Sequence, residues 1–154
     1  MAENEITADF SGEYGKNLML LAAEARKRAY CPYSGFAVGA ALLCRDGEIY
    51  TGCNIENAAY TPTVCAERVA LFRAVSDGKR EFSAIAIVGG EKDGVSPFCA
   101  PCGVCRQALA EFCGGELRLL LGTPEDYRVF RFDELLPFAF SPADLGAKTP
   151  EKQN

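Results

Sequence analysis

Three cysteines stand at a spacing that suits a metal site. Cys102 and Cys105 form Cys-x-x-Cys, which lets two thiolates bind one metal ion, and Cys65 comes earlier, at another predicted helix start. Because the chain contains no histidine, a site for a soft metal has to be built from thiolates. Three protein ligands that leave a fourth position open are typical of a catalytic zinc, whereas a structural zinc usually has four. The spacing therefore predicts a zinc site that can do chemistry.

Glu67 and Arg68 place two charged groups beside this predicted site. The stretch "TVCAERVALF" (63–72) puts Glu67 two positions after Cys65, where a helix is expected to begin. A carboxylate held there can move protons as a general base and acid, or it can simply stabilise the helix dipole from an exposed first turn. Arg68 can donate to the thiolates, unless it is only a surface arginine. The guanidinium and two helix N-termini would offset the negative charge that three thiolates leave around Zn²⁺.

The cysteine pattern also leaves other interpretations open. A lone Cys-x-x-Cys can be redox-active, and small buried cysteines can sit at helix starts without binding anything. The spacing of "CAPCGVC" (99–105) is that of an iron–sulfur run, but no fourth cysteine followed by proline continues it. In a reducing cytosol the eight cysteines are not expected to form a disulfide framework. We expect packing roles for the remaining five, Cys31, Cys44, Cys53, Cys99 and Cys113.

Hydrophobic periodicity and turn signals predict the elements that position these residues. Helical spacing over 14–30 predicts a first helix, and Arg-Asp-Gly at 45–47 predicts a hairpin between strands 36–44 and 48–56. The remaining predicted elements are helices 65–76 and 102–112, strands 82–90, 117–122 and 127–132, a short helix and turn at 133–142, and a frayed tail at 146–154. This order predicts a single α/β domain over 1–154, a three-layer α/β/α sandwich with a mixed five-stranded sheet. Both cysteine stretches then lie where open sheets of this class tend to bind ligands.

The overall composition narrows the class of partner. The chain has 154 residues and a net charge of −5, and its basic residues are scattered, which argues against polynucleotide binding. No apolar run approaches the ~20 residues that a membrane span needs, and the polar start "MAENEITADF" does not resemble a signal peptide. We therefore expect a cytoplasmic protein that binds neither nucleic acid nor membrane.

The signature residues resemble those of the cytidine deaminase family. They are Cys65-Ala66-Glu67 and, later, Pro101-Cys102-x-x-Cys105 continuing as Arg106-Gln107. The stretches "YCPYSGFAVGAAL", "GCNIENAAY" and "LLPFAFSP" are similar to the small, homotetrameric branch, so the resemblance covers roughly 14–145. It implies zinc-dependent hydrolytic deamination of cytidine, and of 2'-deoxycytidine, to uridine or deoxyuridine plus ammonia, in pyrimidine salvage.

The resemblance also implies a role for each matching residue. Zinc would be bound by Cys65, Cys102 and Cys105, one ion per chain, with Arg68 beside the thiolates. Glu67 would carry a proton from the attacking water to N3 of cytosine and then assist ammonia departure. Asn54 and Glu56, two apart on the predicted strand and so on one face of it, would hold the ribose. The remaining matches are Phe36 against the base, the Ala66 N–H toward the pyrimidine O2, and Ala58, Tyr60 and Phe140 entering the pocket of a neighbouring subunit.

Two other functions remain open from the sequence. A related small deaminase, acting on blasticidin or on a free base, would keep the zinc signature but would not need Asn54 and Glu56 for a sugar. A non-catalytic zinc-binding module would need a fourth protein ligand and would release no ammonia. Glu67 and the lack of a plausible fourth ligand favour the enzyme.

Overall fold

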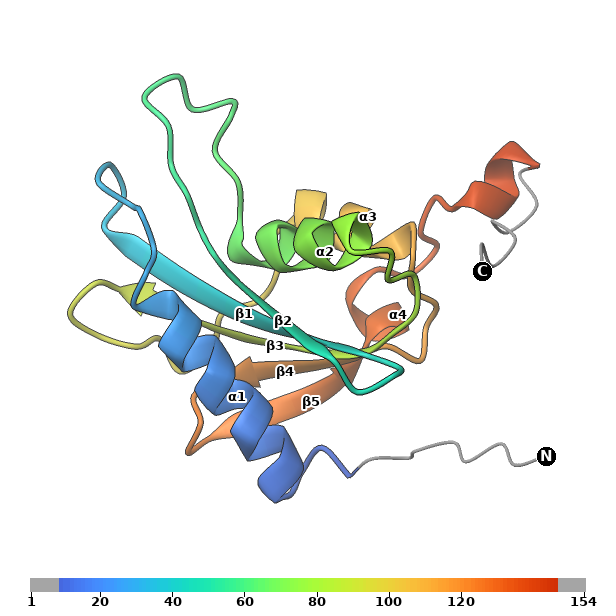
Figure 1. Cartoon of the computed structure of the whole chain (residues 1–154), viewed down its shortest axis with the longest axis horizontal. Coiled ribbons are helices and arrows are strands. Elements are labelled where there is room, and N and C mark those ends of the chain that lie inside the picture. Colours follow the sequence, from blue (N-terminus) through green and yellow to red (C-terminus); the bar gives the residue numbers. More distant parts are fainter. Residues whose placement is uncertain (1–8, 147–154) are drawn as a thin grey trace.

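The molecule is built around one five-stranded sheet (Figure 1). The computed structural model describes residues 9–146 of the chain. The strands are β1 (Phe36–Cys44), β2 (Ile49–Cys53), β3 (Phe82–Glu91), β4 (Arg118–Gly122) and β5 (Tyr127–Arg131). The helices are α1 (Glu13–Arg26), α2 (Ala66–Ser76), α3 (Gly103–Ala110), the short α4 (Phe132–Leu135) and a 3₁₀ turn, η1 (Pro142–Leu145). The strand order is β2-β1-β3-β4-β5, with β3 and β4 parallel and the other pairs antiparallel. The predicted mixed sheet is confirmed.

The two faces of the sheet are covered by different helices. Along β1, Ala41 and Leu43 face a core with Met19 of α1, whereas Ala40 and Leu42 face the core beneath α2 and α3. This alternation follows the two-residue period of a strand, and it recurs along β3 and β4. Apolar side chains on both faces explain why the strands read as nearly continuous hydrophobic runs. The predicted α/β/α sandwich is therefore confirmed, with α2 and α3 sharing one layer.

For one helix and one strand, the predicted end lies further along the chain than the observed end. Helix α1 ends at Arg26 rather than at 30, because Tyr30 leaves the helix and forms a parallel bridge with Ile55. Strand β2 ends at Cys53 rather than at 56, because the side chain of Asn54 takes over the pairing with β1. Asn54 and Glu56 thus lie beyond the strand, and the expectation that they share a strand face is wrong.

The other boundaries agree with the predictions to within one or two residues. Helices α2 and α3 each begin one residue after the cysteine that was expected to open them, and α3 ends at Ala110 instead of 112. Those cysteines, Cys65 and Cys102, are the N-cap residues instead. The frayed tail predicted at 146–154 lies, except for its first residue, outside the described part of the chain.

Candidate active site

Two helix starts on the same face of the sheet supply the candidate site. Cys65 is the N-cap of α2 and Cys102 is the N-cap of α3, and neither side chain makes a capping hydrogen bond. Both cysteines have extended backbone, with ψ of 156° and 165°, before the helices begin. Cys105 follows in the first turn of α3. Because helix N-termini carry a positive partial charge, this position favours thiolates.

Strand β2 holds the first turn of α2 in place through Gly52. A Cβ atom at Gly52 would lie 2.5 Å from the Ala66 carbonyl oxygen and 2.6 Å from the Ala70 nitrogen. Only a residue without a side chain lets the helix backbone approach the strand this closely. The closeness fixes the start of α2, and with it Cys65 and Glu67, against the sheet.

The three thiols converge on one point. The sulfur atoms of Cys65, Cys102 and Cys105 all lie within 4.8 Å of one another, and those of Cys65 and Cys102 are 3.8 Å apart. Zinc–sulfur bonds of ~2.3 Å in a tetrahedral arrangement put neighbouring sulfurs about 3.8 Å apart, so this donor set fits zinc. Cys105 is buried, Cys65 is partly buried and Cys102 is exposed. The cluster is thus open on one side.

Arg68 sits against this cluster, as the sequence predicts. Its Nη2 lies 3.5 Å from the sulfur of Cys65, and among the residues described its Nε is a buried nitrogen without a hydrogen-bond partner. A thiolate at Cys65 accepts hydrogen bonds from Cys105 and Arg68, which lower the pKa of Cys65 well below its ordinary value. The guanidinium therefore supplies positive charge where the thiolates concentrate negative charge.

Glu67 lies under the same helix start and is almost fully enclosed. Within residues 9–146 it is the one charged residue that is buried, with 4% of its surface exposed. Burial raises the pKa of its carboxyl to about 7, and the nearby charge of Cys65 acts in the same direction. A carboxyl whose pKa lies near neutrality can both accept and donate a proton. It is not one of the three groups that could hold the metal.

Cys99 is a neighbour of the site but not part of the cluster. Its side chain packs where Gly89 of β3 leaves room, since a Cβ at Gly89 would lie 2.5 Å from the Cys99 sulfur. Burial raises the pKa of this thiol to about 11, so it stays protonated. The packing role expected for Cys99 agrees with this position.

The residues expected to contact the substrate come from the start of β1, the segment just after β2 and the start of α2. Phe36 opens β1 and is partly exposed, and its carbonyl accepts a hydrogen bond from Asn54 Nδ2 at 2.8 Å. Asn54 Oδ1 also accepts from the Val38 N–H at 2.8 Å, which leaves one amide N–H and one lone pair for a ligand. Glu56 Oε1 accepts from the Ser34 hydroxyl at 2.8 Å. Ala66 is the first residue of α2, where the backbone N–H has no partner within the helix.

The three residues expected to serve a neighbouring subunit are exposed in the single chain. Ala58 and Tyr60 lie on the loop between β2 and α2, which rises above the layers in Figure 1. Tyr60 is 71% exposed and has a φ of 59°. Its ring contacts Tyr33, with the two ring centres 6.0 Å apart. Phe140 lies after α4 and is 58% exposed. The structure thus does not bring these side chains into the chain's own thiol cluster.

Comparison with known protein families decides the assignment. The model of the cytidine and deoxycytidylate deaminase zinc-binding region matches residues 13–120, which include all three thiols and Glu67. The chain belongs to this family. The predicted family and the predicted zinc are confirmed by this match together with the thiol cluster.

Individual deaminases are similar over most of the chain. A cytidine deaminase of Sporosarcina psychrophila is 51% identical over 131 residues, which are 84% of this chain and 93% of that protein. The crystal structure of a cytidine deaminase from Burkholderia pseudomallei superposes with a TM-score of 0.74 at 46% identity, covering 80% of this chain and 97% of that one. The blasticidin-S deaminase of Bacillus cereus matches less, with 37% identity over 79 residues, 49% of this chain and 56% of that protein.

Three further residues of this deaminase-family chain were given no role by the sequence reasoning. Ser34 donates both its backbone N–H and its hydroxyl to Glu56. Arg106 donates to the Leu135 carbonyl at 2.5 Å, and Gln107 donates to the Phe140 carbonyl at 2.9 Å. The position of Arg106 and Gln107 directly after the Cys-x-x-Cys pair was the signal that could have found them. No sequence signal marks Ser34.

Proposed function

We propose that this chain catalyses the hydrolytic deamination of cytidine and 2'-deoxycytidine, giving uridine or deoxyuridine and ammonia. The observation that carries the proposal is the buried carboxyl of Glu67 beside an open cluster of three thiols. Its support is the family of the chain and the deaminases that it resembles over most of its length.

The proposed reaction depends on proton transfer by one carboxyl, that of Glu67. Zinc, when bound by Cys65, Cys102 and Cys105, supplies Lewis-acid activation of the water that attacks C4 of cytosine. Glu67 takes a proton from that water and delivers it to N3, since a buried carboxyl with a pKa near 7 serves in both directions. The same carboxyl then takes the remaining proton from the hydroxyl now on C4 and passes it to the amino group on C4. The C4–N bond breaks, ammonia leaves, and the carbonyl of uridine forms.

The substrate is proposed to bind beside Phe36, Asn54 and Glu56. The free N–H and lone pair of Asn54 and the second carboxylate oxygen of Glu56 suit the hydroxyl groups of a ribose. Phe36 offers an aromatic surface to the base, and the unpaired N–H of Ala66 suits the pyrimidine O2. Ser34 holds the Glu56 carboxylate through its backbone N–H and its hydroxyl.

We further propose a homotetramer in which neighbouring subunits complete each pocket. The exposed side chains of Tyr60 and Phe140, 71% and 58% exposed in the single chain, support this arrangement. Ala58 lies on the same projecting loop as Tyr60. A ring that is mostly exposed in one chain is available to line the site of another.

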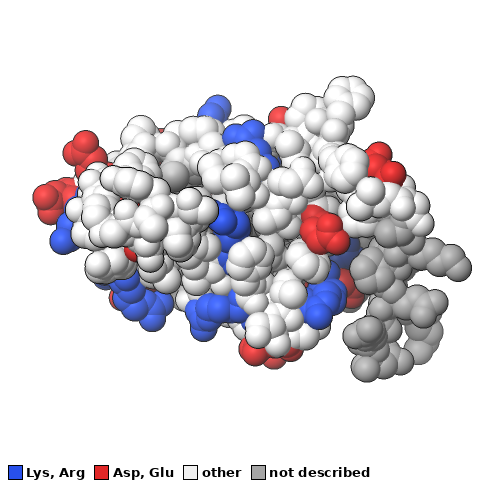
Figure 2. Space-filling model, turned by 90° about the horizontal axis from the view of Figure 1, so that it is seen from above, with Lys and Arg blue, Asp and Glu red and all other residues white. Residues whose placement is uncertain are grey.

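A cytoplasmic role in pyrimidine salvage, without polynucleotide or membrane partners, completes the proposal. Basic and acidic side chains are interspersed on the face shown in Figure 2, where no continuous basic patch is visible. Within the described residues, no helix combines the length and apolarity that crossing a membrane requires. We also propose that residues 1–154 form a single catalytic domain.

Two alternatives are less well supported. The match to a blasticidin-S deaminase spans about half of each chain, whereas the cytidine deaminases of Sporosarcina psychrophila and Burkholderia pseudomallei match over four fifths of this chain or more. A non-catalytic zinc module requires a fourth protein ligand, and the metal-binding group found in residues 9–146 contains three cysteines and no other residue.

The deciding experiment compares cytidine, free cytosine and blasticidin S as substrates of one zinc-analysed preparation. We expect the cytidine absorbance to fall with release of equimolar ammonia, and little turnover of the other two. Full zinc content without ammonia from any substrate would establish the non-catalytic module. Equal turnover of cytosine and cytidine would show that the enzyme does not recognise the sugar.

The sugar contacts are tested on Glu56→Ala, with Glu24→Ala on α1 as the matched surface control. Losing hydrogen bonds to a sugar costs on the order of 1–3 kcal/mol of binding free energy. We expect the preference for cytidine over cytosine to fall in Glu56→Ala and in Asn54→Ala, and to be unchanged in the control. An unchanged preference in both variants would exclude these side chains from the pocket.

A further inference from the structure

The turn before β1, residues 31–36, brings Ser34 beside two residues proposed to bind the substrate. The Gly35 N–H donates to the Cys31 carbonyl at 3.0 Å, which closes the turn. Gly35 has a φ of 66°, a left-handed backbone that glycine adopts without the strain of a side chain. Its carbonyl accepts from the Lys92 N–H at 2.8 Å. The backbone around Ser34 is therefore held both within the turn and from the segment after β3.

The hydroxyl of Ser34 lies between Phe36 and Glu56. Its oxygen accepts a hydrogen bond from the Phe36 N–H at 3.0 Å, the two-residue pattern of a serine turn. On its other side, Glu56 Oε1 lies 2.8 Å away. A hydroxyl has one hydrogen to donate, and a backbone N–H cannot accept it. The hydrogen therefore goes to the carboxylate of Glu56.

Glu56 is held at its backbone as well as at its carboxylate. Its backbone N–H donates to the Tyr30 carbonyl at 2.8 Å, and the Ser34 N–H is shared between the two carboxylate oxygens, each at 3.2 Å. Hydrogen bonds to a charged acceptor are stronger than those between neutral groups. Within residues 9–146, Oε2 takes part only in the shared N–H bond, so it keeps a lone pair for a sugar hydroxyl.

Phe36 is connected to both proposed sugar-binding side chains through its backbone. Its N–H donates to the Ser34 hydroxyl, and its carbonyl accepts from Asn54 Nδ2 at 2.8 Å. The residue proposed to face the base and the two proposed to hold the ribose thus belong to one hydrogen-bonded group. Ser34 makes the connection between Phe36 and Glu56.

We propose that Ser34 is a positioning residue that sets how strongly the site recognises the sugar, because it holds the Glu56 carboxylate in place for the ribose hydroxyls. The inference rests on the proposed function and names a determinant of specificity in the same site. Ser34 acts through Glu56 and not by contact with the substrate. A carboxylate on a partly exposed segment samples several rotamers, and two donors from a fixed turn select one of them. The ordered oxygen then binds a hydroxyl at a smaller entropy cost.

Equilibrium binding of uridine and uracil tests this role without turnover, because they are the proposed product and its free base. The measured quantity is the preference for uridine, the ratio of the two dissociation constants from calorimetry. In Ser34→Ala we expect this preference to fall by about tenfold, the effect of losing a hydrogen bond to a charged group. Ser34→Thr keeps the hydroxyl at an exposed position and should stay within about threefold of wild type.

Two results of this measurement would overturn the proposal. The first is an unchanged preference for uridine in Ser34→Ala. The second is an equal loss in the alanine and threonine variants, because the hydroxyl is then not the cause.

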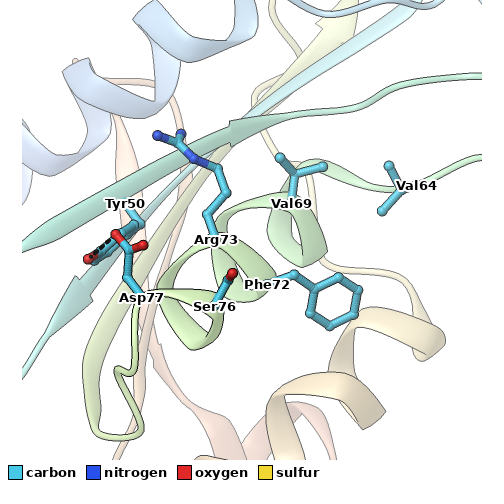
Figure 3. Close-up of a pocket in the computed structure, with 7 residues that line it drawn as sticks. All are labelled: Tyr50, Val64, Val69, Phe72, Arg73, Ser76 and Asp77. Carbon is cyan, nitrogen blue, oxygen red and sulfur yellow. Dashed lines mark hydrogen bonds between the residues drawn. The ribbon is translucent and has the colours of Figure 1, made fainter.

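Two other serines provide matched controls. Ser11 donates its backbone N–H and its hydroxyl to the Asp9 carboxylate, the same pair of bonds that Ser34 makes, but just before α1. Ser76 lies in a groove beside α2 (Figure 3), and none of the residues that line this groove is proposed to touch the substrate. Ser11→Ala and Ser76→Ala should keep the wild-type preference. A loss in either control as large as that in Ser34→Ala contradicts a specific role for Ser34.

Steady-state kinetics separate sugar positioning from damage to the fold. Ser34→Ala should raise KM for cytidine about tenfold while kcat stays within about threefold of wild type, the pattern of lost uniform binding. A serine that only stabilised the turn would instead lower the thermal unfolding midpoint and the amount of active enzyme, which reduces kcat. A reduced kcat with an unchanged KM therefore contradicts the proposal.

A double-mutant cycle tests whether Ser34 acts through Glu56. Once Glu56→Ala has removed the carboxylate, adding Ser34→Ala should change the preference for uridine by less than about twofold. If the two single losses multiply instead, the residues act independently and the proposed role of Ser34 is wrong.

The outcomes also separate this proposal from the proposed function. A wild-type protein that prefers uridine but releases no ammonia, and whose preference falls in Ser34→Ala, supports the positioning role and refutes the deaminase. Normal deamination with an unchanged preference in Ser34→Ala refutes the positioning role alone. Equal binding of uridine and uracil by the wild type refutes the sugar site and the role of Ser34 together, and leaves the chemistry at Glu67 standing.

Discussion

The guanidinium of Arg68 lies against the thiol of Cys65, with Nη2 3.5 Å from the sulfur. The two residues are three positions apart, so the first turn of α2 presents a metal ligand and its counter-charge together. Three thiolates around a zinc ion leave a net negative charge, which weakens the activation of water at the metal. Arg68 and the two helix N-termini offset that charge.

Replacing Arg68 with glutamine should therefore lower cytidine turnover while the fold is kept. Groups that support metal ligands typically contribute 10–100-fold to activity or metal affinity, and we expect a loss in that range. Arg80→Gln, which removes an arginine that donates to the backbone carbonyls of Val75 and Lys79 around the end of α2, is the control and should behave as wild type. Turnover and zinc content measured on the same samples check this. Wild-type values for both in Arg68→Gln would show that the charge is not needed.

The ligand assignment predicts opposite effects on zinc content when Cys102 and Cys99 are replaced with alanine. Cys102→Ala should lose bound zinc, because two thiolates remain from a set of three. Cys99→Ala should keep it, since Cys99 packs against β3 outside the cluster. Metal analysis of the purified variants is the measurement. Zinc retained by Cys102→Ala, or lost from Cys99→Ala, would reject this ligand assignment.

Glu67→Gln should keep zinc and fold but lose catalysis. The amide is nearly isosteric with the carboxyl, yet it cannot take a proton from water or deliver one to N3. Positioned acid–base groups typically contribute about 10²–10⁴-fold, and one group here serves several transfers, so we expect a loss near or beyond the upper value. A variant that binds zinc and retains more than about a tenth of wild-type turnover, far above that range, is incompatible with Glu67 as the proton carrier.

Metal removal should change which cysteines react with iodoacetamide. Burial raises the pKa of Cys113 to about 12, so at pH 8 its thiolate fraction is about a thousandfold below that of an ordinary cysteine. Chelation should make Cys102 reactive, because this thiol is exposed once no metal is bound to it. Cys113 should stay unmodified until the pH approaches 12 or the chain unfolds. Peptide mapping by mass spectrometry checks both sites. Rapid labelling of Cys113 in the folded protein at pH 8 would contradict the burial argument.

Gly52→Ala should lower both the stability of the fold and the activity of the site. The new methyl group would overlap the backbone of α2 at Ala66 and Ala70, and such overpacking typically costs about 1–3 kcal/mol of unfolding free energy. Displacing the start of α2 also moves Cys65 and Glu67, so turnover should fall with stability. Gly94→Ala, where a Cβ meets nothing within 4 Å, is the matched control. Denaturant unfolding and cytidine turnover of both variants measure the difference.

The sheet, its layers and the thiol cluster could be predicted because each depends on local patterns. The apolar run 82–90 marked a central strand, the turn at 45–47 marked a hairpin that begins with 36–44, and the Cys-x-x-Cys spacing within one helical turn required Cys102 and Cys105 to be close. The position of Cys65 beside them was implied by the resemblance to the cytidine deaminase family. These features need little knowledge of how distant segments meet.

The features that the sequence did not predict depend on contacts between distant segments or on backbone conformation. The side chain of Asn54 replaces a strand residue only because Phe36 and Val38 present their backbone to it. The closeness of Gly52 to α2 cannot be read from a glycine alone. The left-handed backbone at Phe138, with a φ of 56°, gave no signal at all, because phenylalanine is not a residue from which such a conformation is expected.

The middle strand of the sheet, β3, separates the metal ligands in the chain, with Cys65 before it and Cys102 and Cys105 after it. A growing polypeptide on the ribosome therefore holds one ligand while α2 and β3 are made, and gains the other two only when α3 follows. Metal capture has to wait until the later helix has docked beside the earlier one. The set of three thiol ligands is thus complete only once α3 has been made, and a product clipped between α2 and α3 splits the ligands between two fragments.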